Sequence, residues 1–126
     1  MHIISSKPLS LSDLRTLILE GSKIKLSTEV VQKIQVCREY LDQKIATTSE
    51  PIYGINTGFG ALCDVRIQSE NLTKLQENLV RSHACGMGEL VPKSIVKLML
   101  LLKIKSLSYG HSGVQLATVN RLVAFY

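Results

Sequence analysis

Two side chains in this sequence have the chemistry of a catalytic or binding group, Tyr53 and His83. A phenol can act as a general base only where its surroundings stabilise the phenolate, and a closing loop could supply such surroundings. His83 follows the helically spaced Leu72, Leu75 and Leu79 by four residues, so we expect its imidazole to point inward. The residues alone leave structural roles open for both: Tyr53 could anchor its loop to the core, and His83 could be a hydrogen-bonded interior histidine.

Tyr53 lies in a stretch of unusual composition, residues 47–68. Gly54, Gly58 and Gly60 are closely spaced there, which is typical of a segment that bends sharply or changes shape. Apolar and aromatic residues accompany them, and a solvated linker would lack these. A loop of roughly 20 residues inside a compact domain is usually a lid or a binding loop. The sequence therefore favours a functional loop at 47–68 over a mobile surface connection.

Other site chemistries have weaker support in the residues. The glycine pattern matches neither a dinucleotide fingerprint nor a phosphate loop, because it follows no expected strand and lacks a Gly-Lys-Ser/Thr ending. The histidines are scattered, and His83-x-Cys85 supplies only two metal ligands, so we expect no metal site. The 3 cysteines form an odd set without a C-x-x-C pair, which indicates reduced thiols.

Hydrophobic periodicity predicts a mainly α chain, since strand signals are almost absent. The fourth expected helix is apolar nearly all the way round, as is typical of a helix inside a larger helical assembly. The last has no capping glycine, no basic last turn and no following proline, so we expect a helix cut before its natural end. The expected helices span about 11–20, 28–46, 69–84, 92–107 and 113–126.

Composition limits the classes of protein to which the chain can belong. Its 126 residues, 45% hydrophobic and 20% charged, indicate one globular domain or part of one and exclude disordered and collagen-like proteins. The net charge of +5 is dispersed, and with 4 Tyr, 2 Phe and no Trp we expect no nucleic-acid partner. The apolar stretch at 95–102 is too short to span a membrane, and the first residues lack an export pattern. We therefore expect a cytoplasmic protein without a membrane partner.

Three sequence blocks carry a specific resemblance. They occur in the order and spacing of the N-terminal portion of the aromatic amino acid ammonia-lyases, and they are most similar to the histidine ammonia-lyases. The blocks are Tyr53-Gly-Ile-Asn-Thr-Gly-Phe-Gly60, Asn78-Leu-Val-Arg-Ser-His83-Ala-Cys-Gly86-Met-Gly88 and Leu107-Ser-Tyr-Gly110-His-Ser-Gly113.

The resemblance implies the N-terminal helical domain of the aromatic ammonia-lyase (L-aspartase-like) fold, with 47–68 as a glycine-rich lid loop. It implies a homotetramer with shared active sites that eliminates ammonia from L-histidine to give trans-urocanate, a step of histidine degradation. Tyr53 matches the lid tyrosine, the base for the β-proton or an essential proton-transfer partner. Ser82-His83 matches the pair near the substrate side chain, which favours histidine as the substrate and His83 as a substrate-binding residue.

The resemblance also implies an electrophile, 4-methylideneimidazol-5-one (MIO), which the family forms from an internal Ala-Ser-Gly tripeptide. Residues 1–126 lack this tripeptide, since their only Ser-Gly pair, Ser112-Gly113, follows His111. We therefore expect 1–126 to be an N-terminal fragment that is inactive alone. Lys105 stands where the family usually has Asn. The remaining alternatives are a tyrosine or phenylalanine ammonia-lyase or aminomutase, and a non-catalytic helical interaction module.

Overall fold

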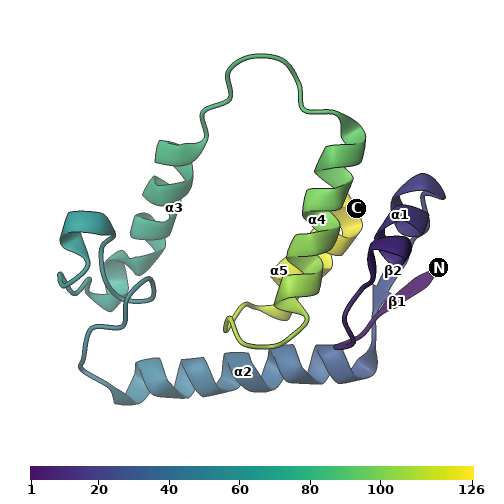
Figure 1. Cartoon of the computed structure of the whole chain (residues 1–126). Coiled ribbons are helices and arrows are strands. Elements are labelled where there is room, and N and C mark those ends of the chain that lie inside the picture. The colour runs from purple at the N-terminus through teal and green to yellow at the C-terminus, as the bar shows by residue number, and fades with distance from the viewer. The chain divides into compact units, whose positions relative to one another are not determined.

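The chain folds mainly into helices joined by turns and loops, as the computed structural model shows (Figure 1). The structure describes residues 1–126, with the side chains at positions 62 and 69 outside the description. The predicted helical class is confirmed. The elements are β1 (His2–Ile4), α1 (Leu11–Leu19), β2 (Ile24–Leu26), α2 (Thr28–Thr47), α3 (Leu72–His83), α4 (Lys93–Leu107) and α5 (Leu116–Phe125), with short 3-10 turns at Gly60–Leu62 and Ser69–Asn71.

The described chain divides into two compact units. Unit 1 consists of Met1–Ala46 together with Leu90–Tyr126, and unit 2 consists of Thr47–Glu89. Unit 1 therefore contains both strands, α1, α4, α5 and nearly all of α2, whereas unit 2 contains α3 and the predicted lid segment.

The N-terminal part of unit 1 is a small β-α-β arrangement. Strands β1 and β2 pair in parallel, with His2 opposite Ile24. Between them, α1 begins with a capping box: the Ser10 hydroxyl accepts from the Asp13 amide at 3.1 Å, and the Asp13 carboxylate accepts from the Ser10 amide at 2.8 Å. Hydrogen bonds from Ser10 lower the pKa of Asp13. The two strands were not predicted, because three residues are too few for a period-two pattern to stand out.

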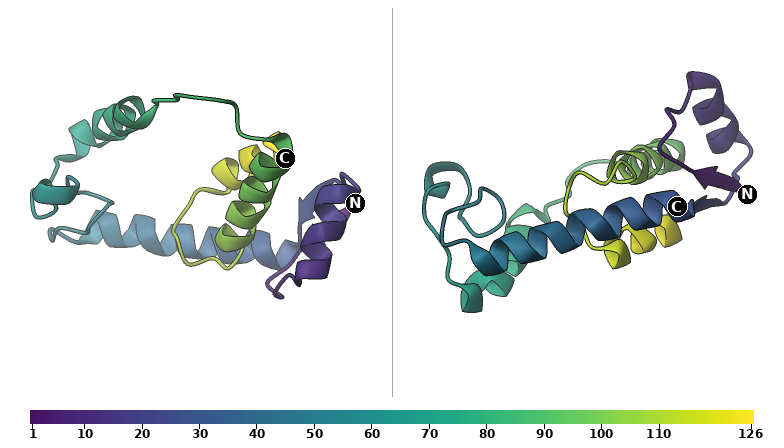
Figure 2. Two further views of the ribbon diagram at one scale, coloured as in Figure 1. Left: turned by 45° about the horizontal axis from the view of Figure 1, so that its top comes forward. Right: turned by 90° about the horizontal axis from the view of Figure 1, so that it is seen from below.

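The core of unit 1 joins elements that are distant in sequence. Both strands, α1, α2, α4 and α5 each contribute buried apolar side chains. Helix α4 packs against α5 and α1, whose ribbons are drawn from two further sides in Figure 2. Burying one such side chain stabilises a fold by about 1.5–3 kcal/mol. The core residues are Ile4, Leu17, Ile24, Leu26, Val30, Ile34, Leu101, Ile104, Leu107 and Val119.

One face of α4 keeps its apolar side chains in contact with solvent. Met99 is 63% exposed and Leu102 is 46% exposed, beside the half-exposed Val91 and Val96. These residues line an apolar groove together with Leu100, Lys103 and Ser106. Within the described part of the chain, none of the helices is both long enough and apolar enough to traverse a bilayer.

The turn between α4 and α5 approaches α2 very closely. Gly110 has φ +73°, and a Cβ atom added there would lie 2.8 Å from Lys33 Cβ and 3.0 Å from the Lys33 carbonyl carbon. Three residues later, the Gly113 amide donates to Cys37 Sγ at 3.3 Å and its carbonyl accepts from Arg38 at 3.3 Å. The third sequence block, residues 107–113, therefore provides the contacts between this turn and α2.

Lys105 connects α4 to the segment after β1. Its side chain is only 6% exposed, and Nζ donates to the Lys7 carbonyl oxygen at 2.6 Å and to that of Ser5. Nζ also lies 4.7 Å from the centre of the Tyr109 ring, a cation–π distance. Burial lowers the pKa of Lys105, and attraction to the Glu29 carboxylate acts in the opposite direction. The lysine at this position thus satisfies two carbonyls outside regular structure.

Gly110→Ala should lower the free energy of unfolding by about 2–4 kcal/mol. The alanine would add the cost of a positive φ to an overlap with the α2 backbone. Gly21→Ala is the matched control, because Gly21 has φ +60° and open space around it, so only the φ cost of about 1 kcal/mol applies. Denaturant unfolding measures both, and equal losses for the two variants would contradict the close approach.

Lys105→Met should destabilise the protein by about 1–3 kcal/mol, because the Ser5 and Lys7 carbonyls would lose their donor while the aliphatic volume is kept. Lys103→Met on the exposed side of the same helix is the control and should change stability by less than about 0.5 kcal/mol. Thermal and denaturant midpoints give the comparison. An unchanged midpoint for Lys105→Met would show that these hydrogen bonds contribute nothing.

Candidate functional site

The segment predicted as a lid loop has an ordered backbone around the Tyr53 block. Thr57 and Arg66 form an isolated antiparallel bridge, in which the Gly58 amide donates to the Val65 carbonyl at 3.1 Å and the Ile67 amide donates to the Asn56 carbonyl at 2.8 Å. The 3-10 turn at Gly60–Leu62 lies within the return of the chain. Tyr53 is therefore carried by a closed loop with its own hydrogen bonds.

Asn56 is the centre of this loop and is only 5% exposed. Its side-chain Oδ1 accepts from the Ile52 amide at 2.6 Å, and Nδ2 donates to the Glu50 carbonyl at 3.2 Å. Its own amide donates to the Ile52 carbonyl at 3.2 Å, and its carbonyl accepts from Ile67. All four polar groups of Asn56 thus have a partner, as a buried amide residue requires.

Thr57 binds Gly54, the residue directly after Tyr53, through its side-chain hydroxyl. Thr57 is completely buried. Its Oγ1 accepts a hydrogen bond from the Gly54 amide at 3.3 Å and donates one to the Gly58 carbonyl at 3.0 Å. Gly54 has φ +74°, a conformation that suits glycine and reverses the chain directly after Tyr53. The sequence assigned no role to Asn56 or Thr57. Asn, Thr and Gly are each common in turns, so the run Asn56-Thr57-Gly58 could have indicated a turn held by side chains at this point.

The Tyr53 ring itself projects into solvent. It is 65% exposed, and its neighbour is Phe59, whose ring lies edge-on with centroids 6.2 Å apart and planes at 71°. The alternative that Tyr53 anchors the loop to a core does not fit this exposure. None of the described hydrogen bonds uses the Tyr53 hydroxyl, so the phenol is available to an external group.

The three predicted lid glycines differ in what they do. Gly54 and Gly60 have positive φ, +74° and +58°, whereas Gly58 is buried and its amide belongs to the bridge with Val65. Gly54 and Gly60 therefore permit the sharp turns of the loop. Gly58 instead takes part in the hydrogen bonds of the bridge between Thr57 and Arg66.

His83 does not point inward as predicted. It is exposed at the C-terminal end of α3, and no residue of that helix is buried. The stripe formed by Leu72, Leu75 and Leu79 is only half-buried. Helical spacing places His83 on the same side as these leucines, but burial requires another element to cover them, and nothing in unit 2 does so fully.

The local hydrogen bonds of His83 select one neutral tautomer. Nδ1 lies 2.9 Å from the Leu79 carbonyl oxygen and 3.0 Å from Ser82 Oγ, and the Ser82 hydroxyl donates to the same carbonyl at 2.9 Å. A carbonyl oxygen can only accept, so Nδ1 carries the proton of the neutral imidazole. Within the described part of the chain Nε2 has no hydrogen-bond partner, and in this tautomer it can accept a hydrogen bond. The Ser82-His83 pair therefore presents a hydrogen-bond acceptor to its surroundings.

Tyr53 and His83 belong to the same unit but are not joined. Among the residues that the structure describes, no hydrogen bond or ring contact connects them. Nor does any group of three His, Cys, Asp or Glu side chains in the described chain suit a metal ion. The two predicted site residues of unit 2 are thus separate from each other in the described structure.

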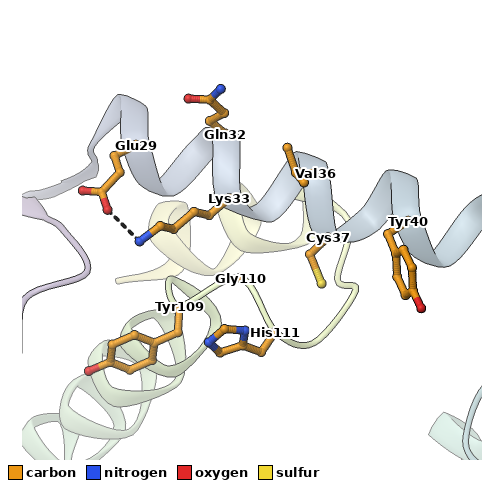
Figure 3. A pocket seen from close by; sticks show the side chains of 9 residues that line it. All are labelled: Glu29, Gln32, Lys33, Val36, Cys37, Tyr40, Tyr109, Gly110 and His111. Atoms are coloured by element: carbon orange, nitrogen blue, oxygen red, sulfur yellow. Dashed lines mark ion pairs between the residues drawn. The ribbon is translucent and has the colours of Figure 1, made fainter.

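Unit 1 contains a pocket of about 660 Å³ (Figure 3). An ion pair at its edge joins Lys33 Nζ to Glu29 Oε1 at 2.7 Å, and hydrogen bonds from Lys33 and Ser6 lower the pKa of Glu29. None of the predicted site residues lines this pocket. Its lining comes from α2 and the turn after α4, namely Glu29, Gln32, Lys33, Val36, Cys37, Tyr40, Tyr109, Gly110 and His111.

Residues 1–126 do not fit the source of an MIO electrophile. Their only Ser-Gly pair, Ser112-Gly113, follows His111 instead of alanine. In addition, the Gly113 amide and carbonyl are bonded to Cys37 and Arg38, and a Cβ atom on Gly113 would lie 2.5 Å from Leu41 Cδ2. The Ser112-Gly113 pair therefore belongs to the turn that packs against α2.

Comparison with known proteins relates nearly the whole chain to one family. A family model described as aromatic amino acid lyase matches residues 9–126. Histidine ammonia-lyase of Legionella pneumophila (strain Lens) is 40% identical over 124 residues, which cover 98% of this chain and 24% of the relative. The chain therefore spans about a quarter of the length of the curated relatives that it matches.

Solved structures show the same relationship at the level of the backbone. Histidine ammonia-lyase from Trypanosoma cruzi gives a TM-score of 0.82 at 34% identity, covering 96% of this chain and 23% of that chain. Phenylalanine aminomutase of Pantoea agglomerans gives 0.91 at 26% identity, covering 100% and 25% respectively.

Proposed function

Because the chain belongs to the aromatic amino acid lyase family, we propose that it is the N-terminal part of a histidine ammonia-lyase. This enzyme would eliminate ammonia from L-histidine and release trans-urocanate. The observation that carries the proposal is the 40% identity to a histidine ammonia-lyase across 98% of the chain. The Ser82-His83 pair at the end of α3 supports the same substrate.

Tyr53 is the proposed proton-transfer residue. The elimination breaks the bond between the substrate's β-carbon and one hydrogen, forms the α,β double bond and breaks the bond to the amino group, which leaves as ammonia. The Tyr53 phenolate oxygen would take the β-proton. Its 65% exposure suits a group that meets a ligand from outside its own loop, and the loop at 47–68 would act as a lid that excludes water from it.

His83 is the proposed substrate-binding residue. With its proton on Nδ1, held by Leu79 and Ser82, the ring offers Nε2 as an acceptor for an N–H of the substrate imidazole. A phenyl or phenol ring has no N–H to offer. A site built around such a hydrogen bond discriminates strongly against analogues that cannot form it.

The rest of the active site would come from elsewhere in the assembled protein. Residues 1–126 contribute the lid and the substrate contact, and the MIO electrophile would form from an Ala-Ser-Gly tripeptide outside them. We further propose a cytoplasmic homotetramer with L-histidine as its small-molecule partner. Residues 1–126 alone would be an inactive fragment, with the lid over residues 47–68.

The alternative within the family is a lyase or aminomutase that acts on tyrosine or phenylalanine, which the backbone similarity to a phenylalanine aminomutase favours. The alternative from another class is a helical interaction module without catalytic activity, which the exposed apolar face of α4 favours.

The gene that encodes residues 1–126 should continue into an Ala-Ser-Gly tripeptide, and its full product should convert L-histidine to urocanate. Ultraviolet absorbance of urocanate measures the rate, with L-tyrosine and L-phenylalanine as comparison substrates. Turnover of tyrosine but not histidine would support the first alternative. A stop codon directly after Tyr126 would support the interaction module.

Tyr53→Phe in the full-length enzyme should lower kcat by about 10²–10⁴-fold, the range expected for loss of a general acid–base group. The fold should persist, because no described hydrogen bond uses the Tyr53 hydroxyl. Tyr40→Phe, at a 63% exposed tyrosine on α2, is the matched control and should keep the full rate. An unchanged kcat for Tyr53→Phe would remove Tyr53 from the reaction.

A further inference from the structure

We propose that Asn56, assisted by Thr57, is a positioning residue that holds the turn presenting Tyr53 in its reactive orientation. This inference rests on the proposed role of Tyr53 in proton transfer. It assigns a task to two buried residues that do not themselves reach a substrate. Both belong to unit 2 and lie between α2 and α3 in the sequence, in a segment that Figure 1 draws mostly as a loop.

The hydrogen bonds of Asn56 converge on the residue directly before Tyr53. Its amide donates to the Ile52 carbonyl, which also accepts from the Ile55 amide at 3.0 Å, while its side-chain Oδ1 accepts from the Ile52 amide at 2.6 Å. Both backbone polar groups of Ile52 are therefore held by Asn56. Asn56 Nδ2 also donates a hydrogen bond to the Glu50 carbonyl, so the backbone that leads into the turn is held as well.

Thr57 provides the matching hold directly after Tyr53, since its Oγ1 accepts from the Gly54 amide. The two neighbours of Tyr53 are thus each bonded to a buried side chain. The antiparallel bridge to Arg66 in turn anchors Asn56 and Thr57. The direction of the exposed Tyr53 ring is consequently set by the turn beneath it and by its edge contact with Phe59.

Alanine, aspartate and glutamine would each fail to make the two side-chain hydrogen bonds of Asn56. Alanine would leave the Ile52 amide and the Glu50 carbonyl without partners inside the loop. Aspartate could accept from Ile52 but could not donate to Glu50, and glutamine would displace its amide by one methylene. At 5% exposure Asn56 cannot act on a ligand directly, so it acts through Tyr53. A small displacement of a reacting group can cost about 100-fold in rate.

A double-mutant cycle in the full-length enzyme tests the inference. Asn56→Ala should lower kcat for L-histidine by about 10–100-fold, and Thr57→Val, which keeps the side-chain shape, by about 3–10-fold. In the Tyr53→Phe background, each substitution should lower kcat by less than about 2-fold, because the group that they orient is already gone. Asn71→Ala is the matched control in unit 2, since the exposed Asn71 makes no side-chain cap hydrogen bond.

Hydrogen exchange followed by mass spectrometry supplies a readout independent of activity. Peptides covering 50–58 should exchange about tenfold faster in Asn56→Ala and at the native rate in Asn71→Ala and Tyr53→Phe. Should Asn56→Ala not fold, Thr57→Val carries the same cycle with the shape of the loop preserved. A native exchange rate in a folded Asn56→Ala variant would overturn the inference.

The kinetic outcomes separate this inference from the proposed function. Full losses in both backgrounds, or native kcat for Asn56→Ala and Thr57→Val, would overturn the positioning role while leaving Tyr53 as the proton-transfer residue. A native rate for Tyr53→Phe would instead overturn the role of Tyr53, and with it the orientation that Asn56 is proposed to maintain.

Discussion

Backbone polar groups that lie outside helices and strands need hydrogen-bond partners when they are buried, and the turns of this chain depend on side chains to supply them. Lys105 satisfies the carbonyls of Ser5 and Lys7, and Cys37 accepts from the Gly113 amide. Asn56 does the same around Ile52. Each unit therefore contains a turn whose backbone is held by hydrogen bonds to a few polar side chains.

This constraint explains how an exposed tyrosine can be held in one direction. A ring that is largely in solvent has little packing to orient it, so its orientation depends on the backbone below. Asn56 and Thr57 fix that backbone on either side of Tyr53. The His83 ring is held in a similar way, because its Nδ1 lies within hydrogen-bond distance of Leu79 and Ser82, and Nε2 has no partner among the described hydrogen bonds. In the proposed lyase, the orientations of Tyr53 and His83 are therefore set by their own unit before a substrate binds.

Periodicity was informative where a residue's environment is set by its own helix. It predicted the mainly helical class, and the three sequence blocks indicated the family through the identity and order of their side chains. The predictions that were wrong or missing share one cause: each depended on contacts with another part of the chain. The inward direction expected for His83 depended on an element covering α3, and the two short strands depended on pairing between segments separated by α1. Asn56 received no role, because the run Asn56-Thr57-Gly58 can indicate a turn but does not identify the backbone groups of Ile52 and Glu50 as the partners of the Asn56 side chain.

The sequence by itself determined the helical class, the family and the identity of the residues with site chemistry, because side-chain type and spacing carry that information. Tertiary structure alone decided that Gly110 must lack a side chain beside Lys33, that Lys105 is buried, and that Tyr53 is exposed above a braced turn. These features depend on which atoms approach one another from distant parts of the chain or across a turn. Distances of that kind exist only once the chain has folded.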